Sequence, residues 1–192
     1  MAHHHAKRVL VPLATGCEEL EAITITDLLA RAGVEVVTAG LGKKVEIVKA
    51  ARGAQLVPTT TMEQVVASNE HFDMIVCPGG LPGSNHLRDD PHVQHMLSSM
   101  ARAGLFVAAI CAGPRALVSC HLLDGKKYTC YPNSLDVSPK NAHYVETPVC
   151  VDGNIITSRG PGTAMDFALK LVELLVGKEK ALSVENGLAR AL

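Results

Sequence analysis

The chain has 192 residues, of which 47% are hydrophobic and 19% are charged, and its formal net charge is -1 at pH 7. This length suits a single domain with one sizeable core. The near-neutral charge, without any basic block, excludes the pattern typical of nucleic-acid binding. No run reaches the roughly 18 consecutive apolar residues of a membrane span, so the composition favours a soluble protein that binds a small molecule or itself.

Strand-like and helix-like segments alternate along the first half of the chain. Residues 1–6, with three successive histidines, resemble a trimmed affinity tag, so a single domain is predicted over residues 7–192. In chain order, the pattern predicts a strand at 7–14, a helix at 19–32 that stops at Gly33 and a strand at 34–39. A short hairpin or an edge excursion around Arg52 and Gly53 follows at 45–57, and then a short helix at 62–67 and a strand at 74–77.

The second half continues the same alternation. The pattern predicts a helix at 92–103, a strand at 105–110, a helical segment at 115–118, a hairpin at 149–157 and helices at 163–176 and 178–191. Strands that alternate with helices indicate an α/β fold, with a mostly parallel sheet and helices on both faces. In such sheets ligands bind beyond the carboxyl ends of the strands. The segments that follow the strands at 7–14, 74–77 and 105–110 are therefore expected to converge on a site.

Cys111 lies where an apolar strand ends and a helix is about to begin. A thiol on this turn faces a helix N-terminus, whose unpaired N–H groups and dipole favour the thiolate. The small residues Ala112 and Gly113 leave room for a substrate, as in the nucleophile elbow of serine hydrolases. The competing interpretation is a cysteine packed in the core behind a buried strand.

Three glutamates, Glu18, Glu19 and Glu21, open the first predicted helix. Carboxylates in a first helical turn are favoured by the helix dipole without any function, and a solvated helix start is the plain interpretation. On the other interpretation, one of the three side chains points inward, and Glu21 is the candidate. A carboxyl group held close to a thiolate is pushed toward its protonated form and can then move protons.

Glycine-rich turns and arginines supply candidate anion sites. The turn at Gly79 and Gly80 can point backbone N–H groups at a developing oxyanion, or it is simply a tight turn. Arg52 and Arg159 either bind an anion, hold a dimer contact or are solvated. The Gly-Pro-Gly stretch at 160–162 either cradles an anion or rigidifies a helix entry.

Metal and disulfide chemistry are not expected. His92 and His95 have a spacing compatible with metal ligation, but no third ligand lies nearby in the sequence. The six cysteines show no C-x-x-C pair and no regular spacing. They are predicted to be mostly buried small hydrophobes of a protein in a reducing compartment, and a cytoplasmic location is the expectation.

Five motifs in order give the chain a recognisable pattern: GCEELE at 16–21, RAG at 31–33, PGGLPG at 78–83, AICAGP at 109–114 and TSRGPGT at 157–163. With them the sequence resembles the ThiJ/PfpI superfamily, and within it the DJ-one branch, the parkinsonism-associated deglycase family. The resemblance spans nearly the whole chain after residue 6. It implies a flavodoxin-like three-layer sandwich and a homodimer with a site near the interface.

The resemblance also implies residue roles. Cys111 would be the reactive cysteine and Glu21 the acid hydrogen-bonded to it. The backbone amides of Gly79, Gly80 and Ala112 would form an oxyanion pocket, and Arg52 would lie beside it to stabilise an oxidised sulfur. Members of the family are described as cofactor-independent glyoxalases, as deglycases that reverse early glycation and as oxidation-sensing chaperones.

The sequence departs from the family pattern beside the thiol. Close relatives often carry a His before the proline of a Thr-His-Pro segment, whereas this chain has Cys130, Tyr131 and Pro132. A tyrosine with the usual pKa of about 10 is no base at neutral pH, so the second proton carrier is missing. Protease members place a His directly after the nucleophile, where this chain has Ala112, and peptidase activity is therefore disfavoured.

The sequence leads to one hypothesis, one functional rival and a plain third option, a structural dimer with a vestigial site. In the first, Cys111 attacks a 2-oxoaldehyde such as methylglyoxal or glyoxal, or an early glycation adduct, and Glu21 moves the protons, without metal or cofactor. In the rival, the protein is a non-enzymatic oxidative-stress sensor and redox-regulated chaperone that uses the same cysteine, with its oxidised form stabilised by Arg52. Both need the same pocket, so the sequence does not separate them.

Overall fold

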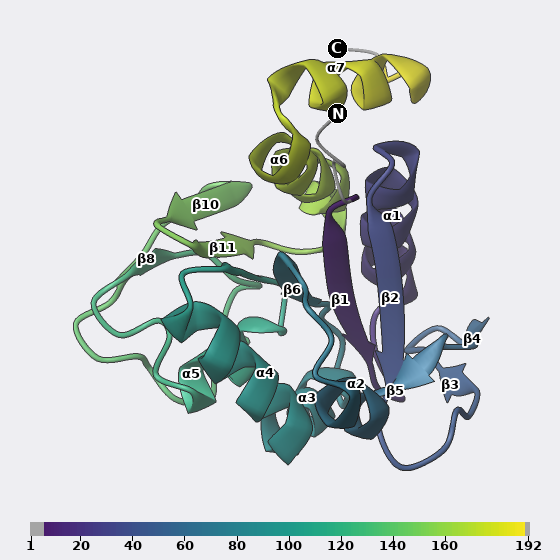
Figure 1. Ribbon diagram of the computed structural model, residues 1–192. Coiled ribbons are helices and arrows are strands. Elements are labelled where there is room, and N and C mark those ends of the chain that lie inside the picture. Colours follow the sequence, from purple (N-terminus) through teal and green to yellow (C-terminus); the bar gives the residue numbers. More distant parts are fainter. Residues whose placement is uncertain (1–5, 191–192) are drawn as a thin grey trace.

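The computed structural model describes residues 6–190, and a seven-stranded sheet forms its centre (Figure 1). The strand order is β10-β11-β7-β6-β1-β2-β5, and all neighbours pair in parallel except β10, which is antiparallel to β11. The strands of this sheet are β1 (Arg8–Leu13), β2 (Glu35–Gly40), β5 (Thr60–Thr61), β6 (Met74–Cys77), β7 (Phe106–Ile110), β10 (Val149–Asp152) and β11 (Ile155–Ser158).

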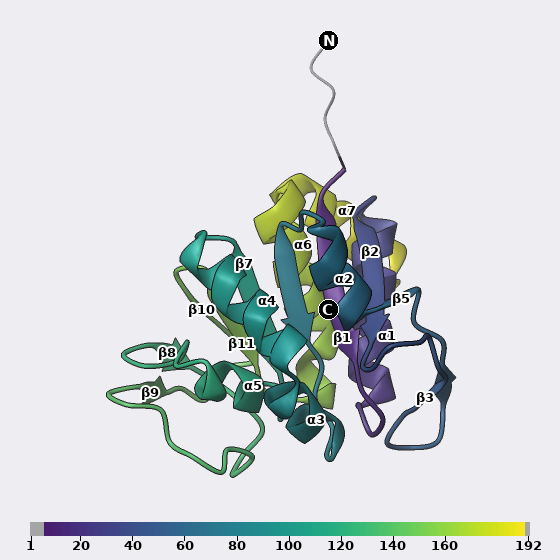
Figure 2. The same ribbon diagram turned by 60° about the horizontal axis from the view of Figure 1, so that its bottom comes forward.

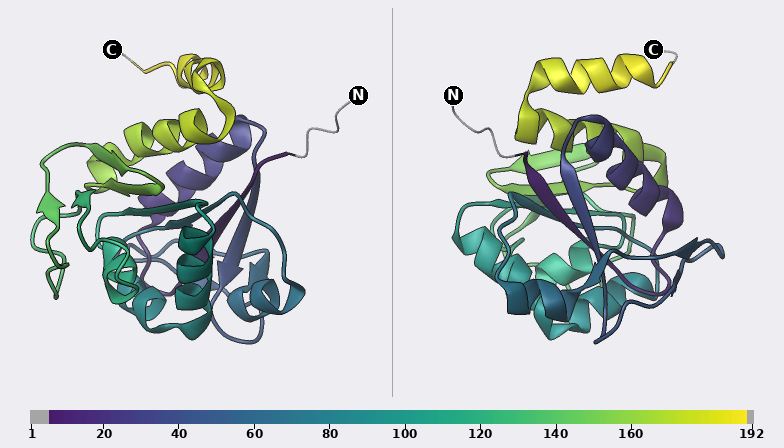
Figure 3. Two further views of the ribbon diagram at one scale, coloured as in Figure 1. Left: turned by 60° about the vertical axis from the view of Figure 1, so that its left-hand side comes forward. Right: turned by 45° about the vertical axis from the view of Figure 1, so that its right-hand side comes forward.

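Helices cover both faces of the sheet, so the expected three-layer α/β sandwich is confirmed. One face carries α1 and α6, and α7 stacks on the outside of α6, while α2 to α5 cover the other face (Figures 1 and 3). The helices are α1 (Glu19–Arg31), α2 (Met62–Ser68), α3 (Gly83–Asp89), α4 (Pro91–Arg102), α5 (Pro114–Ser119), α6 (Ala164–Val176) and α7 (Lys178–Gly187), with a 3-10 turn, η1 (Pro161–Thr163), before α6.

The apolar pattern of each element explains its place in the layers. Val9, Leu10 and Val11 of β1 are fully buried, as expected for a central parallel strand covered on both faces. In α1, the buried side chains recur at helical spacing and face the core, and the Glu18 side chain caps the helix by accepting the N–H of Glu21. Each face of the sheet therefore has its own hydrophobic cluster.

The expected hairpin at 45–57 is present as β3 (Val48–Lys49) and β4 (Gln55–Leu56), which pair antiparallel. Several elements were not predicted, among them the two-residue edge strand β5, which pairs in parallel with β2. The helix α3 has no apolar periodicity, because only Gly83, Ser84 and Leu87 are buried, and it is formed through its packing on α5. The pair β8 (Lys127–Tyr128) and β9 (His143–Tyr144) joins segments distant in sequence, on the β10 side of the sheet and away from β3 (Figure 2).

The strands β1, β6 and β7 are direct neighbours, so the three segments that follow them meet at one edge of the sheet. The last helix ends at Gly187, before the predicted position 191. Of the predicted tag, residues 1–5 lie outside the described part of the chain. Within residues 6–190, none of the helices combines the length and apolar character that a membrane crossing requires.

Candidate active site

Cys111 occupies a strained turn between β7 and α5. Its φ of 63° lies in the left-handed region, which is uncommon for a residue with a side chain and typical of a nucleophile elbow. The backbone N–H of Cys111 donates to the carbonyl of Ser158 (3.0 Å). Its carbonyl accepts the N–H of Tyr131 (3.0 Å) and the hydroxyl of Ser134 (3.3 Å). Hydrogen bonds on both sides of the residue therefore hold the turn in place.

Glu21 lies beside this cysteine from the first turn of α1. Its side chain is completely buried, and Oε2 accepts the N–H of Gly79 at 2.8 Å. Its Oε1 is buried and has no partner in regular hydrogen-bond geometry among residues 6–190. The same carboxyl group interacts with the Cys111 thiol. Of the three glutamates at the helix start, Glu21 is thus the one that points inward, as the second interpretation of the sequence required.

Glycine at position 79 makes the close approach of acid and thiol possible. A Cβ atom there would lie 2.5 Å from the Cβ of Cys111 and 2.6 Å from Oε2 of Glu21. Both distances are shorter than the roughly 3 Å or more that a Cβ atom needs from its nonbonded neighbours. The backbone of Gly79 therefore lies directly between the two reactive side chains, with no room for a side chain of its own.

Burial dominates the protonation of both groups. It raises the pKa of the Glu21 carboxyl to about 7, although the Gly79 N–H and the Cys111 thiol both stabilise the carboxylate. Burial, followed by the negative charge of Glu21, raises the pKa of the Cys111 thiol to about 12, and the N–H groups of Gly80 and Ala112 act in the opposite direction. The N–H groups thus favour the thiolate, as the sequence suggested, but burial and the charge of Glu21 act more strongly in the other direction.

The thiolate instead depends on where the shared proton sits. When Glu21 is protonated, its charge no longer opposes ionisation of Cys111, and its O–H can donate to the sulfur. The N–H groups of Gly80 and Ala112 then stabilise the negative sulfur against the cost of burial alone, without the added charge of Glu21. The arrangement can hold one proton between an acid and a thiol, which is what a covalent step with proton transfer needs.

The structure brings together most of the residues singled out in the sequence, with two differences. The Gly79 N–H is bonded to Glu21, so only Gly80 and Ala112 direct N–H groups at the sulfur. Arg52 lies exposed on the hairpin between β3 and β4, and no hydrogen bond or ion pair within residues 6–190 joins its guanidinium to Cys111. Its contribution to an oxyanion pocket remains an expectation.

The other two glutamates have structural roles. Glu18 caps α1, and Glu19 accepts the backbone N–H groups of Arg52 (2.8 Å) and Ala54 (3.4 Å). These bonds fasten the hairpin to the start of α1. The interpretation of Glu18 and Glu19 as merely solvated side chains at a helix start is therefore incomplete, because both carboxylates accept hydrogen bonds from backbone N–H groups.

Tyr131, which stands where the family pattern has a histidine, is joined to the site through its backbone N–H, which donates to the Cys111 carbonyl. Its side chain is 52% exposed, and its ring lies against Gly160, where an added Cβ would be 3.2 Å from Cδ2. A hollow of about 280 Å³ beside it is lined by Tyr131, Arg159 and the glycine-rich turn at 160–163. Ser134 and Ser158, which hold the Cys111 backbone, were not singled out from the sequence: no motif marks Ser134, and Ser158 is noted only as part of the TSRGPGT motif.

No three histidine, cysteine or acidic side chains in residues 6–190 are grouped as metal ligands would be. The six cysteines are all unpaired, and five of them are buried, as predicted.

Residues 7–174 match the DJ-1/PfpI family. The chain belongs to this family. The DJ-1/PfpI protein dj-1beta of Drosophila melanogaster is 45% identical over 184 residues, which cover 95% of this chain and 97% of that protein. Its crystal structure matches with a TM-score of 0.90 and 44% identity over 98% of this chain and 100% of that one.

Two further members of the DJ-1/PfpI family bear on the site. A protein of Caenorhabditis elegans named a glutathione-independent glyoxalase, DJR-1.2, is 37% identical over 192 residues, the full length of both chains. A structure of Toxoplasma gondii DJ-1 described as oxidized matches with a TM-score of 0.90 and 41% identity over 97% of this chain and 100% of that one. Together with the fly protein, these relatives place the chain in the DJ-1 branch of the family.

Proposed function

We propose that the protein is a cofactor-independent glyoxalase and deglycase that acts on 2-oxoaldehydes, such as methylglyoxal and glyoxal, or on their early glycation adducts. The observation that carries the proposal is the buried Glu21 carboxyl beside Cys111, with a pKa raised to about 7 by burial. An acid poised near neutral pH can both donate and accept a proton during one turnover. The name of the worm relative supports the same chemistry.

The reaction begins at the aldehyde carbon of the substrate. The Cys111 thiolate forms a C–S bond to it, the carbonyl π pair moves to oxygen, and protonated Glu21 gives its proton to that oxygen, which yields a hemithioacetal. The Glu21 carboxylate then removes the proton from the former aldehyde carbon to form an enediolate, and returns it to the neighbouring carbon. The hydroxyl proton moves from the first oxygen to the second in the same rearrangement. The product of this isomerisation is a thioester of a 2-hydroxy acid.

Water completes the turnover. It adds to the thioester carbonyl, the C–S bond breaks with its electron pair on sulfur, and the 2-hydroxy acid leaves. No electron is gained from or lost to another molecule, since the aldehyde carbon is oxidised while its neighbour is reduced. The N–H groups of Gly80 and Ala112, which face the sulfur, are placed to stabilise negative charge in these steps.

The test is consumption of methylglyoxal and formation of lactate by Cys111→Ser and Glu21→Gln variants. We expect each to lose activity by at least about a hundredfold, because a nucleophile or a proton carrier is removed. Cys120→Ser is the matched control, since Cys120 is a free cysteine at the end of α5, outside the site. Unchanged turnover in the folded Cys111 and Glu21 variants would reject the proposal.

The rival function is a redox sensor with chaperone activity, and one observation favours it. The N–H groups that face the sulfur of Cys111 would also receive the oxygens of a sulfinate, and a protonated Glu21 would donate to them. The oxidized state of the Toxoplasma relative points the same way. Intact-mass measurement after mild peroxide, beside a glyoxalase assay of the same sample, separates the two functions: a gain of two oxygens at Cys111 without turnover of the reduced protein supports the sensor.

We further propose a homodimer in the cytoplasm. Leu20 and Ile23 on α1 are 50% and 51% exposed, and Ile47 and Val57 of the adjoining hairpin region are 59% and 69% exposed. Exposed apolar side chains of this size are suited to contact a second copy. The six unpaired cysteines support a reducing compartment.

A further inference from the structure

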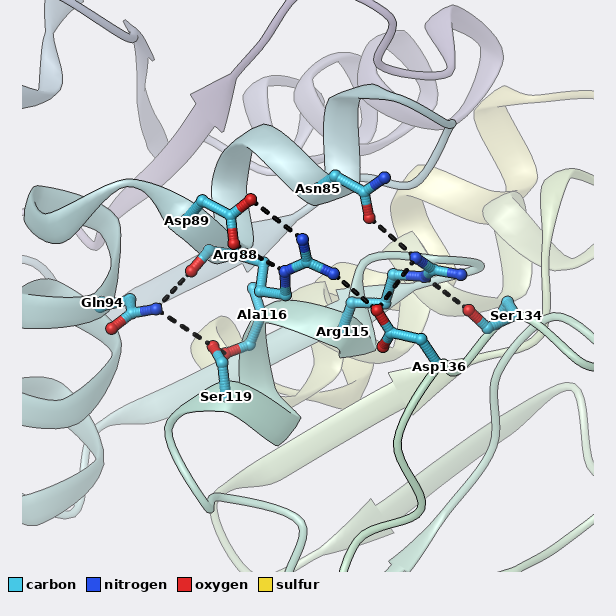
Figure 4. A network of polar contacts seen from close by, with 9 residues as sticks. All are labelled: Asn85, Arg88, Asp89, Gln94, Arg115, Ala116, Ser119, Ser134 and Asp136. Atoms are coloured by element: carbon cyan, nitrogen blue, oxygen red, sulfur yellow. Dashed lines mark hydrogen bonds and ion pairs between the residues drawn. The ribbon is translucent and has the colours of Figure 1, made fainter.

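We propose that Arg115 is a positioning residue that clamps the segment 131–136 onto the Cys111 turn and thereby sets the reactivity of the thiol. This inference rests on the proposed role of Cys111 as the nucleophile. Arg115 lies in the first turn of α5, four residues after Cys111, and its side chain is only 13% exposed. It takes part in the polar network between α3, α4, α5 and the segment 131–136 (Figure 4).

The guanidinium of Arg115 binds three acceptors from two separate parts of the chain. Its Nε donates to the backbone carbonyl of Ser134 (2.5 Å), and its Nη1 donates to Oδ1 of Asn85 (2.8 Å) and lies 3.4 Å from Oδ2 of Asp136. A planar fork of donors is needed for such a set, which the single ammonium group of a lysine does not provide. Arg115 thus joins α3 on one side to the segment 131–136 on the other (Figure 4).

The segment 131–136 in turn restrains the reactive cysteine. The N–H of Tyr131 and the hydroxyl of Ser134 both donate to the Cys111 carbonyl, at 3.0 and 3.3 Å. The Ser134 N–H closes a tight turn by donating to the Tyr131 carbonyl (3.0 Å). Since Cys111 has a left-handed backbone conformation, these bonds hold a conformation that the residue would not keep by itself.

The Asn85 contact extends the clamp to the opposite wall of the site. Asn85 lies in α3, which directly follows the turn whose Gly80 N–H faces the sulfur. Fixing α3 and the segment 131–136 to one guanidinium therefore fixes the sulfur relative to the N–H groups that stabilise its charge. A second arginine, Arg88, reinforces the far end of the segment by binding Asp136 at 2.6 Å, but it makes no bond to Ser134.

The experiment measures the rate at which iodoacetamide alkylates Cys111 as a function of pH, in Arg115→Met and in the wild type. We expect alkylation at neutral pH to slow about tenfold and its midpoint to move up by about one pH unit, because the sulfur loses its alignment with the N–H groups. Hydrogen exchange at the Tyr131 amide is expected to speed up. Alkylation is followed by peptide mass, so that the other five cysteines do not interfere.

Arg8→Met is the matched control. Arg8 also binds three groups, the side chains of Glu35 and Glu70 and the carbonyl of His71, and its side chain is 25% exposed. It lies at the amino end of β1, away from the edge where the site forms. We expect Arg8→Met to lower thermal stability while its alkylation midpoint stays that of the wild type. Both arginine variants are expected to be less stable, so the alkylation midpoint, and not the stability, distinguishes Arg115→Met from Arg8→Met.

Two further variants keep the inference open to refutation if Arg115→Met does not fold. Arg115→Lys and Asn85→Ala should shift the midpoint in the same direction by a smaller amount, since each removes part of the clamp. A midpoint equal to that of the wild type in every folded variant, or an equal shift in Arg8→Met, overturns the inference. If the wild-type protein shows no glyoxalase activity but Arg115→Met still shifts the alkylation midpoint, the proposed function is rejected and the positioning role of Arg115 is retained.

Discussion

The buried Glu21 carboxyl makes the free energy of unfolding of the protein depend on pH. Burial raises its pKa from 4.5 in the unfolded reference to about 7 in the folded protein. Because this pKa is raised on folding, the contribution of Glu21 to stability is fully present below pH 4.5. This contribution is lost as the pH rises through about 7, because the folded state must then hold a buried charge.

Glu21→Gln tests this linkage. The variant should be more stable than the wild type at high pH by about 3 kcal/mol, with the difference vanishing in mild acid. Glutamine keeps an acceptor for the Gly79 N–H and carries no charge. Urea unfolding at about pH 5 and about pH 8 measures the difference, and parallel pH profiles of the two proteins would contradict the raised pKa.

Gly79 is the second residue whose chemistry is fixed by its surroundings. Gly79→Ala would place a methyl group 2.5 Å from the Cβ of Cys111, so the acid and the thiol must move apart. We expect a loss of about 1–3 kcal/mol of stability together with slower alkylation of Cys111. Gly187→Ala in α7 is the control, since an added Cβ there meets no atom within 4 Å.

At the scale of elements, α4 supports the strands that deliver the site. The Asp90 carboxylate caps this helix by accepting the N–H groups of His92 (2.9 Å) and Val93 (3.0 Å), and Pro91 occupies the first helical position. The helix packs on β6 and β7, whose ends carry Gly79 and Cys111. Weakening α4 should therefore lower the free energy of unfolding of the whole domain.

Asp90→Ala is expected to lower the free energy of unfolding by about 1 kcal/mol, because two N–H groups lose their acceptor. Asp90→Asn retains an acceptor oxygen and should remain close to the wild type. Chemical denaturation of both variants provides the measurement. Equal losses in the two variants would show that the charge of Asp90, rather than its capping bonds, supports the helix.

At the scale of the whole molecule, the proposed dimer makes a prediction about association. Leu20→Arg combined with Ile23→Arg places two charges on the exposed apolar face of α1 and should convert a dimer to a monomer. Leu182→Arg on α7, where the leucine is 47% exposed, is the control. Sedimentation velocity measures both. A monomeric wild type, or a variant that stays dimeric, would remove α1 as the interface.

The alternation of elements and the position of Cys111 could be predicted from sequence because both are local properties. Apolar runs such as that of β1 mark buried parallel strands, and a cysteine after such a run falls at the edge of the sheet where ligands bind. The helix α3 and the β8–β9 pair lack such local patterns, since their partners lie elsewhere in the chain.

The sequence by itself determined the family, the layered α/β fold and the cysteine at the strand-to-helix turn. The family resemblance singled out Glu21 from Glu18 and Glu19, but only the tertiary structure supplies the physical reason, a contact with Gly79, 58 residues away. The tertiary structure likewise decided that burial outweighs the helix N-terminus at the thiol. Desolvation is a property of everything packed around a group, so no local pattern of residues encodes it.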